Sequence, residues 1–167
     1  MHFKYCPHCG KLLIEKEMGD EGLVPYCEKC HLPLFDMFSS AVITLVVNEY
    51  EEVALLSQDY ISTTYRNLVS GYIKPKETAE QTALREVKEE IGIDLDELHL
   101  IGTYWFEKKD MMMIGFIGKA KKQAFKLSKE VNHACWVNCE EARELVHPYP
   151  STSLALVEYY LNHKNQF

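Results

Sequence analysis

Residues 71–93 read GYIKPKETAEQTALREVKEEIGI, and this stretch carries most of the information in the 167-residue chain. Apolar side chains recur in it at the i, i+3, i+7 spacing of one helix face: Leu84, Val87 and Ile91. Thr78 followed by Gln81 matches a capping box, and Gly92 stands where a helix is expected to stop. The stretch therefore predicts a helix over Thr78–Ile91.

Three acidic side chains gather on one side of this predicted helix: Glu86, Glu89 and Glu90. Residues three and four apart are neighbours on a helix surface, so their charges repel unless a cation lies among them. Carboxylate oxygens favour Mg²⁺ or Mn²⁺, and Mg²⁺ commonly bridges protein carboxylates to substrate phosphates. Arg85 adjoins the cluster and can hold a carboxylate by bidentate pairing. The charge pattern alone leaves two interpretations open, a divalent metal site and a charged helix face in solvent.

The chain as a whole divides near Phe38 into two parts of different composition. Residues 38–167 predict a larger α/β domain in which short apolar runs alternate with helical patterns. We expect strands at 41–48, 53–56, 65–70, 98–106, 112–120 and 134–137, and closing helices at 140–146 and 153–163. Residues 1–37 are rich in Cys, Gly and Pro and contain no long apolar run, so they cannot bury much of a core.

Four cysteines in residues 1–37 form two Cys-x-x-Cys pairs separated by 17 residues: Cys6, Cys9, Cys27 and Cys30. This spacing is within the range of structural zinc sites, and four thiolates complete a tetrahedral Zn²⁺ shell. The alternative is a pair of disulfides, which the lack of an export signal disfavours. We therefore predict a small zinc ribbon over residues 1–37, stapled by its metal.

Composition excludes several classes of protein. Hydrophobic residues make up 47% and charged residues 26%, an ordinary globular balance. Eighteen basic against 25 acidic residues give a net charge of −7, whereas proteins that grip nucleic acid through phosphates are usually basic. The apolar runs are far shorter than the ~20 residues of a membrane span, and the N-terminus has no apolar signal core. We expect a cytoplasmic protein with no membrane segment.

The stretch quoted above resembles the Nudix box. Gly71, five residues, Glu77, seven residues and then REVKEEIGI reproduce every fixed position of that motif. Nudix hydrolases cleave nucleoside diphosphates linked to another moiety. The resemblance implies an α/β/α sandwich around a mixed sheet, with Mg²⁺ or Mn²⁺ held by Glu86, Glu89 and Glu90. It also implies that Glu77 supports the metal site and that Arg85 orients the carboxylates.

A four-cysteine ribbon directly before a Nudix domain is similar to the NADH pyrophosphatase group, which splits NAD(H) into nicotinamide mononucleotide and AMP. Some members of that group also remove NAD caps from RNA. By this likeness Gly71 and Tyr72 lie at the substrate, with the Tyr72 ring stacked on nicotinamide or base, and Ala155 lines the adenine side. Glu130, six residues before Trp136, corresponds to a catalytic or metal-binding glutamate.

The chain also departs from that group. Residues 102–107 read GTYWFE where the group has Gln-Pro-Trp-Pro-Phe-Pro, and Lys74 and Lys76 replace the Glu and Gly of a turn. We expect a metal-dependent hydrolase of NAD(H) or a similar adenine dinucleotide, with NAD-capped RNA as a further candidate. ADP-ribose, nucleotide sugars and nucleoside triphosphates are alternative substrates, and nucleotide sensing without catalysis is the alternative function. The resemblance further implies a homodimer.

Overall fold

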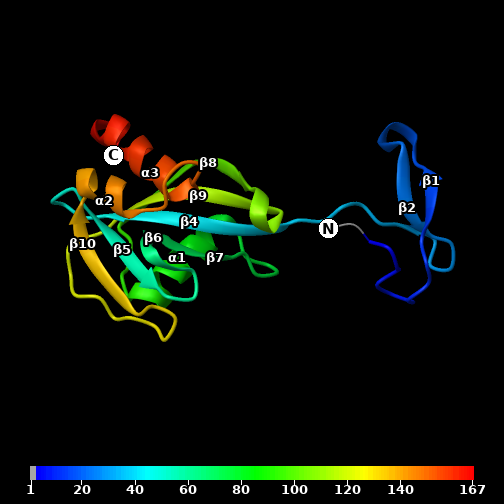
Figure 1. Cartoon of the computed structure of the whole chain (residues 1–167), viewed down its shortest axis with the longest axis horizontal. Coiled ribbons are helices and arrows are strands. Elements are labelled where there is room, and N and C mark those ends of the chain that lie inside the picture. The colour runs from blue at the N-terminus through cyan, green and yellow to red at the C-terminus, as the bar shows by residue number, and fades with distance from the viewer. Residues whose placement is uncertain (1–2) are drawn as a thin grey trace. The chain divides into compact units, whose positions relative to one another are not determined.

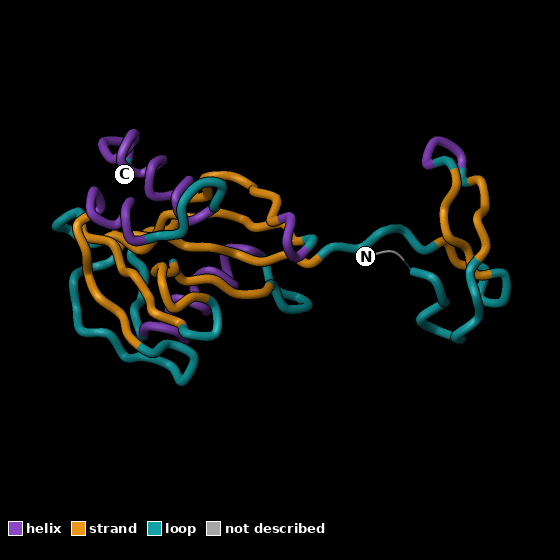
Figure 2. The backbone as a smooth tube through the Cα atoms, in the orientation of Figure 1, coloured by secondary structure: helices purple, strands orange, loops and turns teal. Residues whose placement is uncertain are grey.

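The computed structural model describes residues 3–167, which form two compact units (Figures 1 and 2). The first unit ends at Ser39, and the second runs from Ser40 to Phe167. Each unit has its own sheet. No helix among residues 3–167 is long and apolar enough to cross a membrane.

The first unit is built on a small antiparallel sheet in the order β1-β2-β3. Its elements are β1 (Ile14–Glu17), η1 (Gly19–Glu21), β2 (Leu23–Cys27) and β3 (Leu32–Pro33). Among the described residues of this unit, the buried apolar side chains are Cys6, Val24 and Cys27. Two of these three are cysteines, so the unit has almost no hydrophobic core, as the composition of residues 1–37 predicts.

The second unit contains a seven-stranded sheet in the order β10-β5-β4-β9-β8, with β6 paired to β5 and β7 to β4. The strands are β4 (Ser39–Val47), β5 (Glu52–Gln58), β6 (Ser62–Asn67), β7 (Val69–Tyr72), β8 (Glu97–Phe106), β9 (Met111–Lys119) and β10 (His133–Asn138). The amide of Ala120 donates to the Val47 carbonyl at 3.0 Å, so β4 and β9 end side by side and run in the same direction (Figure 1). The other recorded pairings, such as β8 with β9, are antiparallel, and the sheet is mixed as predicted.

Helices cover both faces of this sheet: α1 (Ala79–Ile91), α2 (Cys139–Leu145) and α3 (Thr152–His163), with short 3-10 turns η2 (Glu107–Lys109) and η3 (Lys164–Gln166). Successive side chains of a strand point to opposite faces. On β4, Leu45 packs with Leu156 of α3, whereas Val46 packs with Val87 of α1. The predicted α/β/α sandwich is therefore confirmed.

The predicted boundaries of α1 are confirmed by its caps. The Thr78 hydroxyl accepts from the Gln81 amide at 3.3 Å, and the Gln81 side chain accepts from the Thr78 amide at 3.0 Å. Gly92 adopts the left-handed conformation, with a φ of 73°, and its amide donates to the Lys88 carbonyl. Local chemistry alone fixes where this helix begins and ends.

The buried face of α1 differs from the one that the apolar spacing predicts. Leu84 is exposed, and the buried stripe runs through Ala83, Val87 and Glu90 to Ile91. The reason is that a carboxylate, Glu90, occupies a core position, so counting only apolar residues shifts the stripe toward Leu84.

The other strands and helices predicted for residues 38–167 lie within two residues of their predicted bounds, with one exception. The single strand predicted at 65–70 is two strands, β6 and β7. The chain changes its partner at Leu68, because β6 pairs with β5 while β7 pairs with β4.

Candidate functional site

Arg85 joins the carboxylates of the predicted site. Its Nε and Nη2 donate to the two carboxylate oxygens of Glu77 at 2.8 and 2.9 Å, a bidentate pair. Its Nη1 donates to Glu86 Oε1 at 2.5 Å and to Glu89 Oε2 at 3.0 Å. One guanidinium thus holds three carboxylates from the loop before α1 and from the middle of α1.

Hydrogen-bond donors occupy both carboxylate oxygens of Glu77. Besides Arg85, the Thr82 hydroxyl and the Lys74 amide donate to its Oε2, at 2.9 and 3.2 Å. The Arg85 guanidinium is the main reason that the pKa of Glu77 is lowered to about 2. Because both Glu77 oxygens are occupied by donors, the geometry favours a supporting role for this carboxylate.

The end of β7 lies against the same carboxylates. A Cβ on Gly71 would come within 2.1 Å of Glu86 Cδ and Oε1, so only glycine lets the Glu86 side chain lie there. The carbonyl of Tyr72 accepts from Arg85 Nη2 at 3.3 Å, and the Tyr72 residue is 54% exposed. The structure therefore places Gly71 and Tyr72 beside the cluster, with the Tyr72 ring available to solvent.

Glu90 has a different environment from the other carboxylates because it is only 4% exposed. Gln58 Nε2 donates to Glu90 Oε1 at 3.1 Å, while Glu90 Oε2 is buried without a hydrogen-bond partner among the described residues. Burial, reinforced by the charge of Glu86, raises the pKa of Glu90 to about 8. A buried carboxylate oxygen without a donor, next to further carboxylates, fits a divalent cation that prefers oxygen ligands.

Glu130 reaches this region from a distant part of the sequence. It is exposed, and its charge also contributes to the raised pKa of Glu90. Its loop is held at both ends, since the Ser128 amide donates to the Glu90 carbonyl at 3.0 Å and the Asn132 amide donates to the Ser57 carbonyl at 2.9 Å. The structure thus brings Glu130 toward the carboxylates of α1.

One predicted site residue lies elsewhere. Ala155 is on α3, which covers the opposite face of the sheet from α1. In contrast, two residues at the cluster, Gln58 and Thr82, were not predicted. No motif points to them, and the only sequence signal is a glutamine that ends the apolar run of β5.

The four cysteines of the first unit also converge. Their sulfur atoms all lie within 4.8 Å of one another, with Cys6 and Cys30 3.9 Å apart and Cys9 and Cys27 3.6 Å apart. Disulfides, at ~2.05 Å, are far shorter. Four sulfurs placed ~2.3 Å from one tetrahedral ion would lie about 3.8 Å apart. The Lys11 backbone lowers the pKa of the Cys9 thiol to about 7, while the contact with Cys9 raises the pKa of the Cys30 thiol to about 12.

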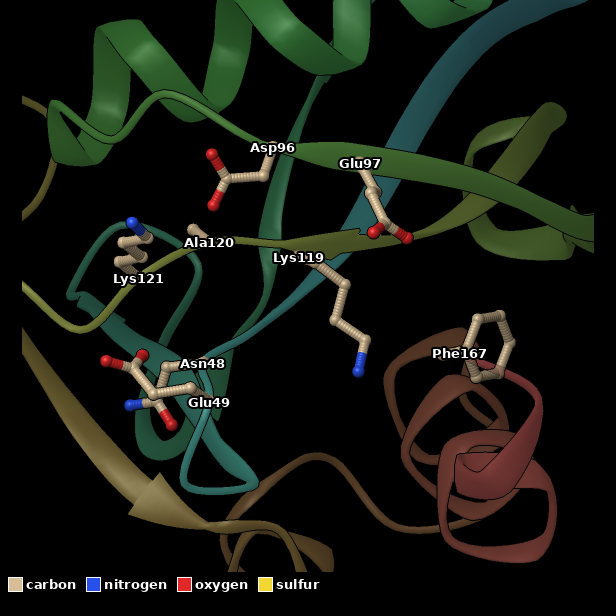
Figure 3. Close-up of a pocket in the computed structure, with 8 residues that line it drawn as sticks. All are labelled: Asn48, Glu49, Asp96, Glu97, Lys119, Ala120, Lys121 and Phe167. Atoms are coloured by element: carbon tan, nitrogen blue, oxygen red, sulfur yellow. The ribbon is translucent and has the colours of Figure 1, made fainter.

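A separate cavity of about 330 Å³ lies at the ends of β4 and β9 (Figure 3). It is lined by Asn48, Glu49, Asp96, Glu97, Lys119, Ala120, Lys121 and Phe167. It shares no residue with the carboxylate cluster, and its walls carry charges of both signs. The predicted site on α1 is therefore distinct from this cavity.

Comparisons with known proteins identify the family of the chain. The NUDIX domain model matches residues 37–157. The chain belongs to the Nudix family. A crystal structure of a NUDIX hydrolase from Nitrosomonas europaea superposes with a TM-score of 0.77 at 21% identity, covering 98% of this chain and 93% of that one.

Similar Nudix sequences include proteins named NAD-capped RNA hydrolase NudC. The one from Pseudomonas fluorescens is 27% identical over 134 residues, which are 80% of this chain and 47% of that protein. The one from Pseudomonas entomophila is 25% identical over 166 residues, 93% of this chain and 59% of that protein. The chain thus spans about half the length of these relatives.

Proposed function

We propose that this Nudix protein hydrolyses the diphosphate of a nucleoside diphosphate derivative with a divalent cation, and that NAD(H) or a similar adenine dinucleotide is its substrate. The observation that carries the proposal is the Arg85-centred carboxylate cluster with the unpartnered Glu90 Oε2. The similarity to proteins named NAD-capped RNA hydrolase supports the dinucleotide and makes NAD-capped RNA a further candidate.

Glu86, Glu89 and Glu90 would hold Mg²⁺ or Mn²⁺. The bound cation would neutralise phosphate charge and lower the pKa of a water molecule. Arg85 and Glu77 keep the carboxylates in place, because the bidentate pair between them fixes the Arg85 fork that holds Glu86 and Glu89. The overall reaction forms one P–O bond from water and breaks one P–O bond of the bridge, which leaves two monophosphates.

The other predicted residues take roles around this centre. Glu130 would act as a further ligand or as the general base for the attacking water. The exposed Tyr72 ring would stack on nicotinamide or base, beside Gly71. Ala155 is assigned to the adenine side on the resemblance alone.

The first unit would carry a structural zinc. We assign residues 1–37 to a zinc ribbon and residues 38–167 to the Nudix hydrolase domain. The sulfur separations of 3.6 and 3.9 Å suit tetrahedral Zn²⁺, and four thiolates leave no coordination position for substrate. A homodimer and a cytoplasmic location complete the proposal.

A substrate panel tests this proposal. The panel holds NADH, NAD, ADP-ribose, a nucleotide sugar, a diadenosine polyphosphate and nucleoside triphosphates, each with Mg²⁺, with Mn²⁺ or with neither. We expect NADH to give reduced nicotinamide mononucleotide and AMP at the highest kcat/KM, only when a divalent cation is present. A better alternative substrate would overturn the dinucleotide assignment, and tight binding without turnover would replace the enzyme by a nucleotide sensor.

A further inference from the structure

Gln58, the last residue of β5, contacts Glu90 in the carboxylate cluster. Gln58 is 1% exposed, and its Nε2 donates to Glu90 Oε1 at 3.1 Å and to the Tyr60 hydroxyl oxygen at 3.2 Å. A side-chain amide nitrogen has two hydrogens, and both are used here. The Gln58 carboxamide thus turns one donor to Glu90 and one to Tyr60, while its Oε1 is buried without a hydrogen-bond partner among the described residues.

The hairpin that carries Gln58 is itself fixed. The Ile61 amide donates to the Gln58 carbonyl at 2.8 Å and closes the turn between β5 and β6. Asn132 bridges this turn to the Glu130 loop, because its amide donates to the Ser57 carbonyl and its side chain accepts from the Asp59 amide, both at 2.9 Å. The β5–β6 register shifts between Leu56 and Gln58, an irregularity of the kind that re-aims side chains next to active sites.

Tyr60 is the second acceptor of the Gln58 amide, and its hydroxyl lies within the field of the carboxylates. Burial of its hydroxyl and the charges of Glu90, Glu130 and Glu86 raise its pKa, so the hydroxyl stays protonated. The oxygen accepts from Gln58, which leaves the hydroxyl hydrogen for an acceptor in this acidic region. The residue as a whole is 68% exposed.

We propose that Gln58 and Tyr60 are a positioning pair for Glu90. Gln58 holds Glu90 Oε1, so that Oε2 is the oxygen presented to the divalent cation, and Tyr60 fixes the Gln58 amide in the donating orientation. The proposal rests on the metal site of the proposed function. It adds a non-helical element, the β5–β6 hairpin, to a site otherwise built on α1, the end of β7 and the Glu130 loop.

Gln58→Met is the direct test, because methionine keeps the length of the buried side chain and removes both N–H donors. Loss of such an outer-shell hydrogen bond to a metal ligand costs about 10- to 100-fold in metal affinity or activity. We expect the affinity for Mn²⁺ to decrease by this factor. Electron paramagnetic resonance measures Mn²⁺ binding while the zinc is retained. We expect kcat to fall with the affinity, while the KM for the dinucleotide stays unchanged.

Thr44→Val is the matched control. Thr44 is also fully buried, its Oγ1 also lacks a partner among the described residues, and it lies between Val42 and Val46 on the sheet face that packs against α1. No hydrogen bond joins Thr44 to Glu90, so this variant should bind Mn²⁺ as the unmodified protein does. An equal loss in Thr44→Val and Gln58→Met would assign the effect to packing and overturn the proposal.

Tyr60→Phe keeps the test decisive if Gln58→Met fails to fold, because it removes only an oxygen atom from a largely exposed residue. Losing one neutral hydrogen bond should weaken Mn²⁺ binding about two- to fivefold. Unchanged Mn²⁺ affinity in the folded variants would overturn the positioning pair and leave the hydrolase proposal standing. Conversely, Mn²⁺ binding that depends on Gln58, in a protein that cleaves no diphosphate, would support the pair and overturn the hydrolase.

Discussion

Side chains of the types that can bind metal ions lie close together in two regions of the molecule, and the two regions are built in opposite ways. In the first unit, four sulfurs lie within 4.8 Å of one another, and four thiolates would complete a tetrahedral shell around one metal ion. In the second unit, the carboxylates of α1 are tied to Arg85 and Gln58, and one buried oxygen, Glu90 Oε2, lacks a hydrogen-bond partner. A closed shell suits a structural ion, whereas an open arrangement can share its ion with a substrate.

The two regions also differ in what surrounds them. The first unit buries little besides its own cysteines, so under the zinc proposal metal binding there would be the same event as folding. The second unit rests on apolar clusters on both faces of its sheet. That core can tolerate a buried carboxylate such as Glu90, whose desolvation disfavours the charged form until a cation arrives. Under the proposed function, the metal of the first unit would stabilise structure and the metal of the second unit would take part in the chemistry.

The largest expected effect is the loss of the first unit when its metal shell is broken. Structural zinc contributes about 10–16 kcal/mol in small domains, so Cys27→Ser should lose zinc and unfold residues before Ser40. Hydrogen exchange should show full amide exchange there and unchanged protection in the second unit. Cys135→Ser, outside the cysteine cluster, is the control. Retained amide protection in a zinc-free first unit would show that this unit folds without its metal, and the contrast between the two regions would be wrong.

The next largest effect is on catalysis. Glu90→Gln replaces the buried carboxylate by a neutral amide of the same shape and should lower kcat about a thousandfold, as expected for the loss of several kcal/mol of metal assistance. Circular dichroism and hydrogen exchange should show an intact fold. Glu80→Gln, at an exposed position on the same helix, should leave kcat unchanged. Equal kcat for Glu90→Gln and the unmodified protein would show that the catalytic site does not lie on α1.

Arg85→Lys sharpens the distinction between holding a carboxylate and binding the metal. Lysine cannot form the bidentate pair with Glu77 while also donating to Glu86 and Glu89, so kcat should fall about 10- to 100-fold. Steady-state kinetics measures this loss. Arg143→Lys alters an exposed pair with Glu158 and should have no effect. A full thousandfold loss in Arg85→Lys would mean that Arg85 acts on the substrate itself.

The last prediction concerns the pH dependence of stability rather than turnover. The pKa of Glu90 is about 8 in the folded protein against an ordinary 4.5, so the folded state binds more protons between these values. The metal-free protein should therefore lose stability, relative to Glu90→Gln, as pH rises from about 5 to about 8. Urea unfolding of both proteins across this range measures the difference. A constant difference would mean that Glu90 is already charged when folded.

Local chemistry predicts a large part of this structure. The capping box at Thr78, the stop at Gly92 and the clustering of acidic residues on α1 all follow from a few neighbouring residues. The two Cys-x-x-Cys pairs likewise predict four converging sulfurs. These features are readable because their partners lie close together in sequence or follow a fixed spacing.

The features of the site that cannot be predicted from the sequence depend on tertiary contacts. The burial of Glu90 in place of Leu84 cannot be read from periodicity, because a carboxylate is not counted as a core residue. The contact from Gln58 to Glu90 spans 32 positions and depends on the irregular β5–β6 register. Only the family resemblance points to Glu130, and the hydrogen bonds that hold its loop join backbone groups and the Asn132 side chain to residues far away in the sequence.

The most direct test of the account measures both metals in one preparation. Protein purified with its zinc is freed of Mg²⁺ and Mn²⁺, its zinc content is determined, and NADH hydrolysis is followed while Mg²⁺ or Mn²⁺ is added back. We predict one zinc per chain throughout, and hydrolysis that is absent at the start and rises with the added cation. Hydrolysis that persists without Mg²⁺ or Mn²⁺ and follows the zinc content would contradict the division between a structural and a catalytic metal.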